Sequence, residues 1–268
     1  MDTKKPKKDQ FVALCADSLG DAEKLLPVVK TLAASLKKGI IVFTCSPDGD
    51  SWVGDLGVPF AALKSDWPSV VETLPTAFNV VLAVTLADPD APRGSAANPR
   101  QLLKNFRQAK IAYLAIPATF QFSRLNFRFS SVALTLNHQR ESKEKLLWAS
   151  YFARFCQSRI MVYHHPYTDP AFRSRLHNNV RYLEKIFSSF GIGYELCALP
   201  KGNQFSDPDP QALLQPDVDL FISLVADQRD RDLLDLFSPP PALQLMKKAP
   251  STPILFLNQR DDLYIMCD

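Results

Sequence analysis

The sequence repeats itself, in the same order, in its two halves. The apolar run Val12-Ala13-Leu14 returns 120 residues later as Val132-Ala133-Leu134, and Asn79-Val80-Val81-Leu82 returns as Asp217-Val218-Asp219-Leu220. The offset between matched segments grows from 120 to about 140 residues, so the second copy carries an insertion. This period is too long for a solenoid repeat, and 268 residues accommodate two domains of ordinary size. The sequence therefore predicts two tandem domains of one fold.

The first copy begins with a strand, a helix and a second strand. Residues 11–16 and 40–45 are apolar runs typical of buried strands. Between them a helical stripe is formed by Leu25, Val29, Leu32 and Leu36. We expect Gly39 to end this helix, because glycine adopts the left-handed conformation common at helix ends. Residues 46–59 are too few for an equal second helix and contain three glycines, so we expect a loop there.

The second copy follows the same order with longer elements. Its first helix is marked by Glu144-Lys145-Leu146-Leu147, which matches Glu23-Lys24-Leu25-Leu26. Periodicity predicts strands and helices at 131–136, 146–155, 160–163, 176–190, 194–199, 220–225, 242–249 and 254–257. Strands joined by crossover helices form parallel sheets. We therefore expect an α/β protein with two tandem domains.

The domain boundaries follow from these elements. We place the first domain at residues 1–118 and the second at 131–268. The linker, residues 119–130, carries phenylalanines at alternating positions instead of the polar residues of a flexible linker. It should therefore be packed against the domains.

Composition excludes several classes of protein. Hydrophobic residues make up 46% and charged residues 22%, which is ordinary for a globular domain. Four lysines near the N-terminus explain the net charge of +3, and nothing downstream indicates a nucleic-acid partner. No apolar stretch is long enough to span a membrane, and none resembles a signal peptide. The five cysteines form no CxxC pair, so we expect a cytoplasmic protein with reduced thiols.

Three segments resemble one known family. Residues 12–18, reading VALCADS, look like the first strand and acidic turn of universal stress proteins. Lys201-Gly202-Asn203 is similar to the turn after their third strand, and residues 249–255 are similar to their last helix-to-strand junction. The resemblance implies an adenine nucleotide alpha hydrolase-like fold, with a mainly parallel five-stranded sheet flanked by helices in each domain. It also implies a stress-linked role and an intramolecular pseudo-dimer joined through the last strands.

Many members of that family bind ATP, but the phosphate-binding pattern is missing here. The family pattern, Gly-x2-Gly-x9-Gly-(Ser/Thr), follows the fourth strand, where glycines let backbone N–H groups surround an anion. In this chain only Gly94 follows the fourth strand of the first copy, and no glycine follows that of the second. The last helices would begin at Asn98-Pro99 and Ser238-Pro239-Pro240-Pro241, where proline removes N–H donors. We therefore expect no tightly bound ATP and no other cofactor.

The ligand-binding candidates are the polar residues that follow the first strand of each copy. These are Asp17 and Ser18 in the first domain and Asn137 and His138 in the second. Asp17 matches the family residue that contacts adenosine, and Asn137 is its counterpart. Asp and Ser are also preferred helix-capping residues, so capping alone is an alternative. For His138 a helix cap is likewise an alternative to a ligand contact.

No other motif indicates catalysis or metal binding. The sequence contains no nucleophile elbow, HExxH or P-loop pattern, and adjacent histidines at 164 and 165 point to opposite faces of a strand. The sequence thus favours a non-enzymatic protein that binds an unknown small ligand or protein partner. The alternative is an adenine-nucleotide binder or weak ATPase that uses Asp17 and a contact such as Arg93. The apolar segment 263–266 should also be covered, and a homodimer would cover it.

Overall fold

The computed structural model describes residues 9–63, 65–108, 111–121, 129–139, 142–164, 166–199, 218–224, 241–248 and 251–258. It divides into two compact units, residues 1–114 and 115–268. The division falls inside a strand, and part of the expected linker, residues 122–128, lies outside the described residues. The boundaries at 118 and 130 therefore stay a prediction.

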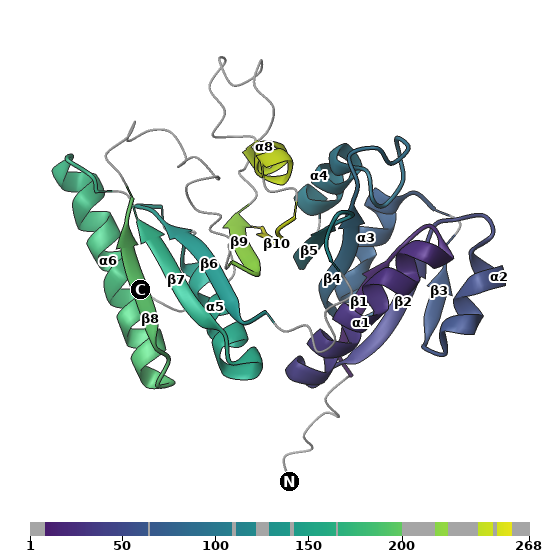
Figure 1. Ribbon diagram of the computed structural model, residues 1–268, viewed down its shortest axis with the longest axis horizontal. Coiled ribbons are helices and arrows are strands. Elements are labelled where there is room, and N and C mark those ends of the chain that lie inside the picture. The colour runs from purple at the N-terminus through teal and green to yellow at the C-terminus, as the bar shows by residue number, and fades with distance from the viewer. Residues whose placement is uncertain are drawn as a thin grey trace, which may run out of the picture. The chain divides into compact units, whose positions relative to one another are not determined.

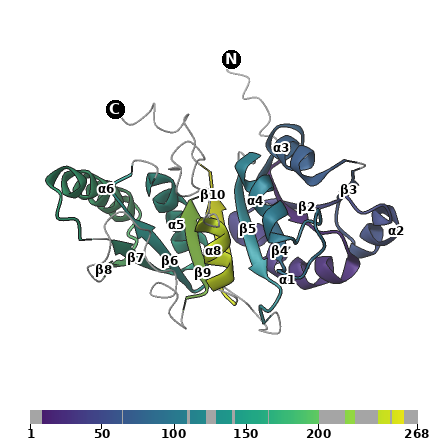
Figure 2. The same cartoon turned by 90° about the horizontal axis from the view of Figure 1, so that it is seen from above.

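The first unit is an α/β sheet with helices on both faces (Figures 1 and 2). Its elements are β1 (Phe11–Cys15), α1 (Leu19–Leu36), β2 (Gly39–Thr44), α2 (Gly49–Val53), a 3-10 turn (Gly54–Leu56), β3 (Phe60–Ala62), α3 (Trp67–Ala77), β4 (Val80–Ala87), α4 (Pro99–Gln108) and β5 (Ala112–Pro117). The strand order is β3-β2-β1-β4-β5, and β1 pairs in parallel with both β2 and β4. Figure 2 shows α1 on one face of this sheet and α3 and α4 on the other.

The second unit repeats this topology. Its elements are β6 (Ser131–Leu136), α5 (Ser142–Cys156), β7 (Arg159–His164), α6 (Pro170–Ser189), β8 (Tyr194–Ala198), β9 (Leu220–Leu224), α8 (Pro241–Lys248) and β10 (Ile254–Leu257). The order β8-β7-β6-β9-β10 is the order of the first unit, and the strands again pair in parallel. The predicted fold class, two tandem α/β domains with five-stranded sheets, is confirmed.

The core explains the apolar runs of the sequence. Residues 12–15 and 132–134 are buried, as strands covered by helices on both faces require. Leu25, Val29 and Leu32 form the buried stripe of α1, as predicted. In the second unit, Phe129 lies just before β6 and packs edge-to-face on Phe152 of α5, with ring centroids 5.5 Å apart.

Two local predictions for the first unit are wrong. Residues 46–59 contain the short helix α2 and a 3-10 turn. Five residues suffice for one helical turn, and this turn buries the side chain of Trp52. The left-handed residue that ends α1 is Lys37, with φ 55°, instead of Gly39. Gly39 begins β2, where an added Cβ would lie 2.7 Å from the ring of Phe11. Close packing, and not helix termination, accounts for this glycine.

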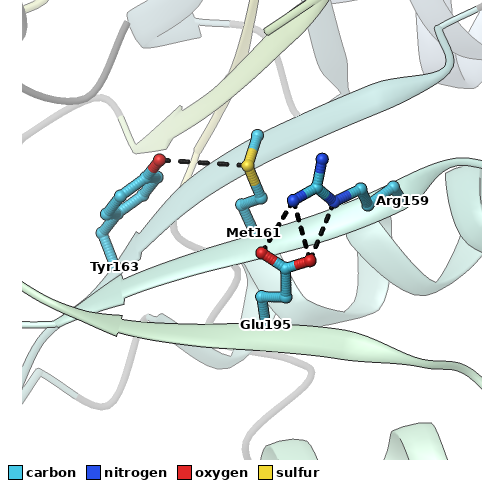
Figure 3. A network of polar contacts seen from close by, with 4 residues as sticks. All are labelled: Arg159, Met161, Tyr163 and Glu195. Atoms are coloured by element: carbon cyan, nitrogen blue, oxygen red, sulfur yellow. Dashed lines mark hydrogen bonds and ion pairs between the residues drawn. The ribbon is translucent and has the colours of Figure 1, made fainter. Parts of the chain in front are cut away.

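Strands β7 and β8 pair in parallel and also carry an exposed cross-strand ion pair (Figure 3). The Arg159 guanidinium donates from Nε to Glu195 Oε1 at 2.9 Å and from Nη2 to Oε2 at 2.8 Å. These hydrogen bonds lower the pKa of the exposed Glu195 carboxyl. Beside them, the buried Tyr163 hydroxyl lies 3.9 Å from the sulfur of Met161. No helix in the described part of the chain has the length and apolarity needed to cross a lipid bilayer.

Candidate functional site

In each unit the strand order reverses beside its first strand, between β1 and β4 and between β6 and β9. Ligands of open α/β sheets bind outside the carboxyl ends of the strands at such a switch point. Asp17 and Ser18 follow β1, and Asn137 and His138 follow β6. The fold therefore places each predicted pair where the first strand of its own unit ends.

The Asp17 carboxylate is occupied by groups of the protein itself. The indole Nε1–H of Trp67, at the start of α3, donates to Asp17 Oδ1 at 2.9 Å and to Oδ2 at 3.1 Å. The backbone N–H of Ala96, in the loop after β4, donates to Oδ2 at 2.6 Å. Trp67 and Ala96 are each only 2% exposed. A carboxylate that accepts these bonds ties together β1, α3 and the loop after β4.

Ser18 is the N-cap of α1. Its backbone is extended, and its hydroxyl accepts a hydrogen bond from the backbone N–H of Asp21 at 3.2 Å. This is the usual chemistry of a serine before a helix. Ser18 therefore caps the helix, and a ligand contact in addition to capping stays a prediction.

The loop after β4 leaves few donors for an anion. Asn98 Oδ1 accepts the backbone N–H groups of Arg100 and Gln101 at 3.1 and 3.4 Å, and Asn98 Nδ2 donates to the carbonyl of Ala91 at 2.8 Å. Pro99, the first residue of α4, has no N–H. The first N–H groups of this helix are thus missing or already bonded. A phosphate would have to displace the Asn98 cap.

Two buried polar side chains, Thr85 of β4 and Asn105 of α4, flank this loop in the sequence. Gln101 donates to Asn105 at 3.0 Å, while Thr85 Oγ1 and Asn105 Nδ2 have no hydrogen-bond partner among the described residues. Burial raises the pKa of Cys15 above its ordinary range, and burial followed by the Cys15 thiol raises that of Tyr113. Burial thus favours the neutral forms of this thiol and this phenol.

A second thiol in this unit is also neutral. Cys45 follows β2 and is half-buried; burial, then the negative charge of Asp17 and of Asp66, raises its pKa to about 12. A neutral thiol is a weak nucleophile. Among the described residues no three His, Cys, Asp or Glu side chains gather as metal ligands.

In the second unit Asn137 is equally occupied. Its Oδ1 accepts hydrogen bonds from the Gln139 N–H at 3.0 Å and from the Ser142 hydroxyl, and its Nδ2 donates to Gln139 Oε1 at 2.9 Å. Asn179 of α6 donates to the carbonyls of Asn137 and Gln139, both at 2.8 Å. The side chain at the position that corresponds to Asp17 is therefore bonded within its own turn.

His138 packs among aromatic rings. Its ring stacks on Phe172 at 4.2 Å between centroids and meets Tyr167 edge-on at 5.1 Å. The first residue of α5 is Ser142, four positions later, so the expected helix-cap role does not fall on His138. The structure makes this histidine part of an aromatic cluster, which sequence reasoning did not predict.

Helix α5 carries a buried lysine, whose ammonium group contacts β6. Lys145 is 3% exposed, and its Nζ donates to Thr135 Oγ1 at 3.1 Å.

The ends of two helices fix how the two copies align. Helices α1 and α5 both end three residues before the next strand, and each is followed by a left-handed residue, Lys37 after α1 and Gln157 after α5. The offset is therefore 120, and Lys145 corresponds to the buried Leu25. The sequence match that paired Lys145 with Lys24 is one residue out of register. It aligned identical residue types, whereas the structure aligns the two buried positions, Leu25 and Lys145.

Trp67, Ala96 and Lys145 were missed by sequence reasoning. Trp67 begins a helix, with Asp66 as its N-cap, and that local signal was available. Nothing in the sequence links this residue to Asp17, since contacts between distant segments depend on the folded chain. Lys145 could have been found as a charged residue on the apolar stripe of α5.

Comparison with known proteins identifies the fold. No protein-family model and no curated sequence matches the chain. It is similar in structure to a universal stress protein from Archaeoglobus fulgidus, with a TM-score of 0.67, 11% identity, and 94% of this chain and 97% of that one covered. It is also similar to a putative universal stress protein from Pseudomonas aeruginosa, with a TM-score of 0.60, 13% identity, and 97% and 96% covered. A protein of unknown function from Pseudomonas aeruginosa matches with a TM-score of 0.59, 13% identity, and 96% and 94% covered. The chain thus has the universal stress protein fold in tandem, as its sequence predicted.

Proposed function

We propose that this protein is a non-enzymatic member of the universal-stress-type fold, which acts by binding a partner and does not bind ATP tightly. One observation carries the proposal: the Asp17 carboxylate, which would contact adenosine, accepts hydrogen bonds from Trp67 and Ala96. A nucleotide would have to share the carboxylate with these two donors or displace one of them. Hydrogen bonds to a charged group contribute about 1.5–3 kcal/mol.

The start of α4 supports the same proposal. Triphosphate binding at a helix N-terminus depends on free N–H groups. Here Asn98 already accepts the N–H groups of Arg100 and Gln101, and Pro99 offers none. In the second unit Asn137 is neutral and bonded within its own turn.

Titration with ATP tests the proposal. A ligand present at 100 times its dissociation constant stabilises the native state by about 2.7 kcal/mol, or roughly 5–10 °C in melting temperature for chains of this size. We expect 1 mM ATP with Mg²⁺ to shift the melting temperature by less than about 2 °C.

Two variants make the result specific. Trp67→Phe removes the indole donor and frees Asp17 Oδ1, while the Ala96 N–H still donates to Oδ2. Any gain in nucleotide binding should appear in this variant and disappear in Trp67→Phe/Asp17→Ala. Asp55→Asn, at an exposed position of the same unit, is the matched control. A shift of 5 °C or more in the unmodified chain that Asp17→Ala abolishes would replace this proposal with the alternative, an adenine-nucleotide binder.

A further inference from the structure

Helices α5 and α6 of the second unit share a connected set of aromatic side chains. Trp148 meets Tyr151 edge-on at 5.6 Å between ring centroids, and Tyr151 stacks on Phe155 at 6.2 Å. The Arg154 guanidinium carbon lies 5.1 Å from the ring centroid of Phe155 and 4.0 Å from that of Phe190, the C-cap of α6. These five residues, which we name the aromatic–arginine face, join the C-terminal ends of the two helices.

This face is exposed to solvent. Tyr151, Phe155 and Phe190 are 41%, 39% and 49% exposed. Among the described residues only two other large apolar side chains, Phe60 and Leu196, are comparably exposed. Scattered apolar residues are normal on a surface, but a contiguous set indicates an interaction site.

The corresponding helix of the first unit lacks these aromatic residues. At the offset of 120 residues, positions 151, 154 and 155 of α5 correspond to Thr31, Ala34 and Ser35 of α1. The first unit thus builds the same helix, on the same kind of sheet, with small side chains. The aromatic–arginine face is therefore specific to the second unit, where α5 packs on the 20-residue α6 and not beside a five-residue helix such as α2. Packing on α6 accounts for the contact with Phe190, and the exposure of Tyr151 and Phe155 is what points to a partner.

The surrounding charge is positive. Helices α5 and α6 pack together on one side of strands β6–β8, as Figure 2 shows. In the C-terminal halves of the two helices the charged residues are Arg154, Arg181, Lys185 and Glu184, all exposed, with a net charge of +2. The other carboxylate of these helices, Glu144, is buried, so Glu184 is the only exposed one on them.

We propose that the aromatic–arginine face binds an acidic peptide segment of a partner protein, one that carries aromatic or long aliphatic side chains. The rings would bury the apolar side chains, and Arg154 would pair its N–H groups with a carboxylate. Arginine held against rings is preorganised, so less side-chain entropy is lost on binding. This inference rests on the proposed function, because it names the chemistry of the partner that the function requires.

The ring geometry favours a peptide over single-stranded nucleic acid. Proteins that bind single strands offer free aromatic faces on which bases stack. Here Phe155 is already stacked with Tyr151 and lies under Arg154, and Phe190 lies under the same guanidinium. These contacts already use part of the ring faces, which leaves less surface on which bases could stack.

The test is selection of random 12-residue peptides displayed on phage against the full chain, with the Tyr151→Ala/Arg154→Glu/Phe155→Ala variant as the counter-target. Enriched peptides should be acidic and should contain aromatic or aliphatic residues. For a synthetic peptide of the enriched sequence, Arg154→Glu should weaken binding at least about tenfold in fluorescence anisotropy, and Arg154→Lys should weaken it less. The matched control is Thr31→Ala/Ser35→Ala in the first unit, which should change the affinity less than about twofold.

Several results would overturn the inference. These are no enrichment over the counter-target, enrichment of basic peptides, or an unchanged affinity in Arg154→Glu with an unchanged melting temperature. Tighter binding of a 12-nucleotide oligouridine that Arg154→Glu abolishes would assign the face to nucleic acid instead. Self-association that the triple variant abolishes would assign it to a second copy. The proposed function fails separately, in the ATP titration, so the two failures are distinguishable.

Discussion

The hydrogen bonds of Asp17 predict that Asp17→Asn, a substitution of almost the same size and shape, lowers the stability of the protein measurably. In Asp17→Asn one carboxylate oxygen becomes an NH₂ group, which cannot accept a hydrogen bond. The two donors, the Trp67 indole at 2.9–3.1 Å and the Ala96 N–H at 2.6 Å, then compete for one oxygen. One donor is left facing another donor in a largely buried site.

The magnitude follows from the charge on the acceptor. A hydrogen bond to a charged group contributes about 1.5–3 kcal/mol, and a buried donor without a partner costs about 1–3 kcal/mol. We therefore expect Asp17→Asn to lower the free energy of unfolding by about 2 kcal/mol. At about 2–4 °C per kcal/mol, the melting temperature should fall by roughly 4–8 °C.

Circular dichroism melting and indole NMR together check this expectation. The chain has three tryptophans, so its ¹⁵N spectrum should show three indole signals, of which that of Trp67 should move in the variant. Asp55→Asn makes the same chemical change at an exposed position and should leave both the stability and the three signals unchanged. If Asp17→Asn and Asp55→Asn melt within about 1 °C of each other, the interpretation of Asp17 as a structural tie is refuted.

Two further predictions concern the same unit. Burial and the charge of Asp17 hold the pKa of Cys45 near 12, so its neutral thiol stabilises the fold below about pH 9, and this contribution is lost as the pH rises toward 12. Cys45 should therefore react slowly with iodoacetamide at pH 8 and faster in Asp17→Asn, as measured by mass spectrometry of the labelled peptide; equal rates would contradict the role given to Asp17. Asn98→Ala removes the cap of α4 and should lower the free energy of unfolding by about 1–2 kcal/mol. Asn178→Ala, at an exposed position inside α6, should not destabilise the chain in the same denaturant titration, because alanine is favoured over asparagine in a helix by up to about 0.7 kcal/mol. Equal effects of the two substitutions would show that the Asn98 cap is unimportant.

Much of the fold could be predicted from local patterns. Buried parallel strands need continuous apolar runs, and the runs at 11–15, 131–136 and 254–257 are strands in the structure. The duplicated order of these runs predicted two units of one fold, and both units have the same strand order. Errors arose where the pattern was short or ambiguous, as at α2, whose five residues carry too little periodicity to distinguish a helical turn from a loop.

The candidate site depended on contacts that no local pattern contains. The sequence by itself determined which residues follow the first strands and that a glycine-rich phosphate loop is missing. Only the tertiary structure decided what those residues do, because Trp67 and Ala96 reach Asp17 from 50 and 79 positions away. The same holds for Lys145, which is buried at the position of Leu25, and for the aromatic–arginine face, which two helices build together. Periodicity determines which face of a helix is buried, whereas the partner that a polar side chain meets is set by how distant segments pack.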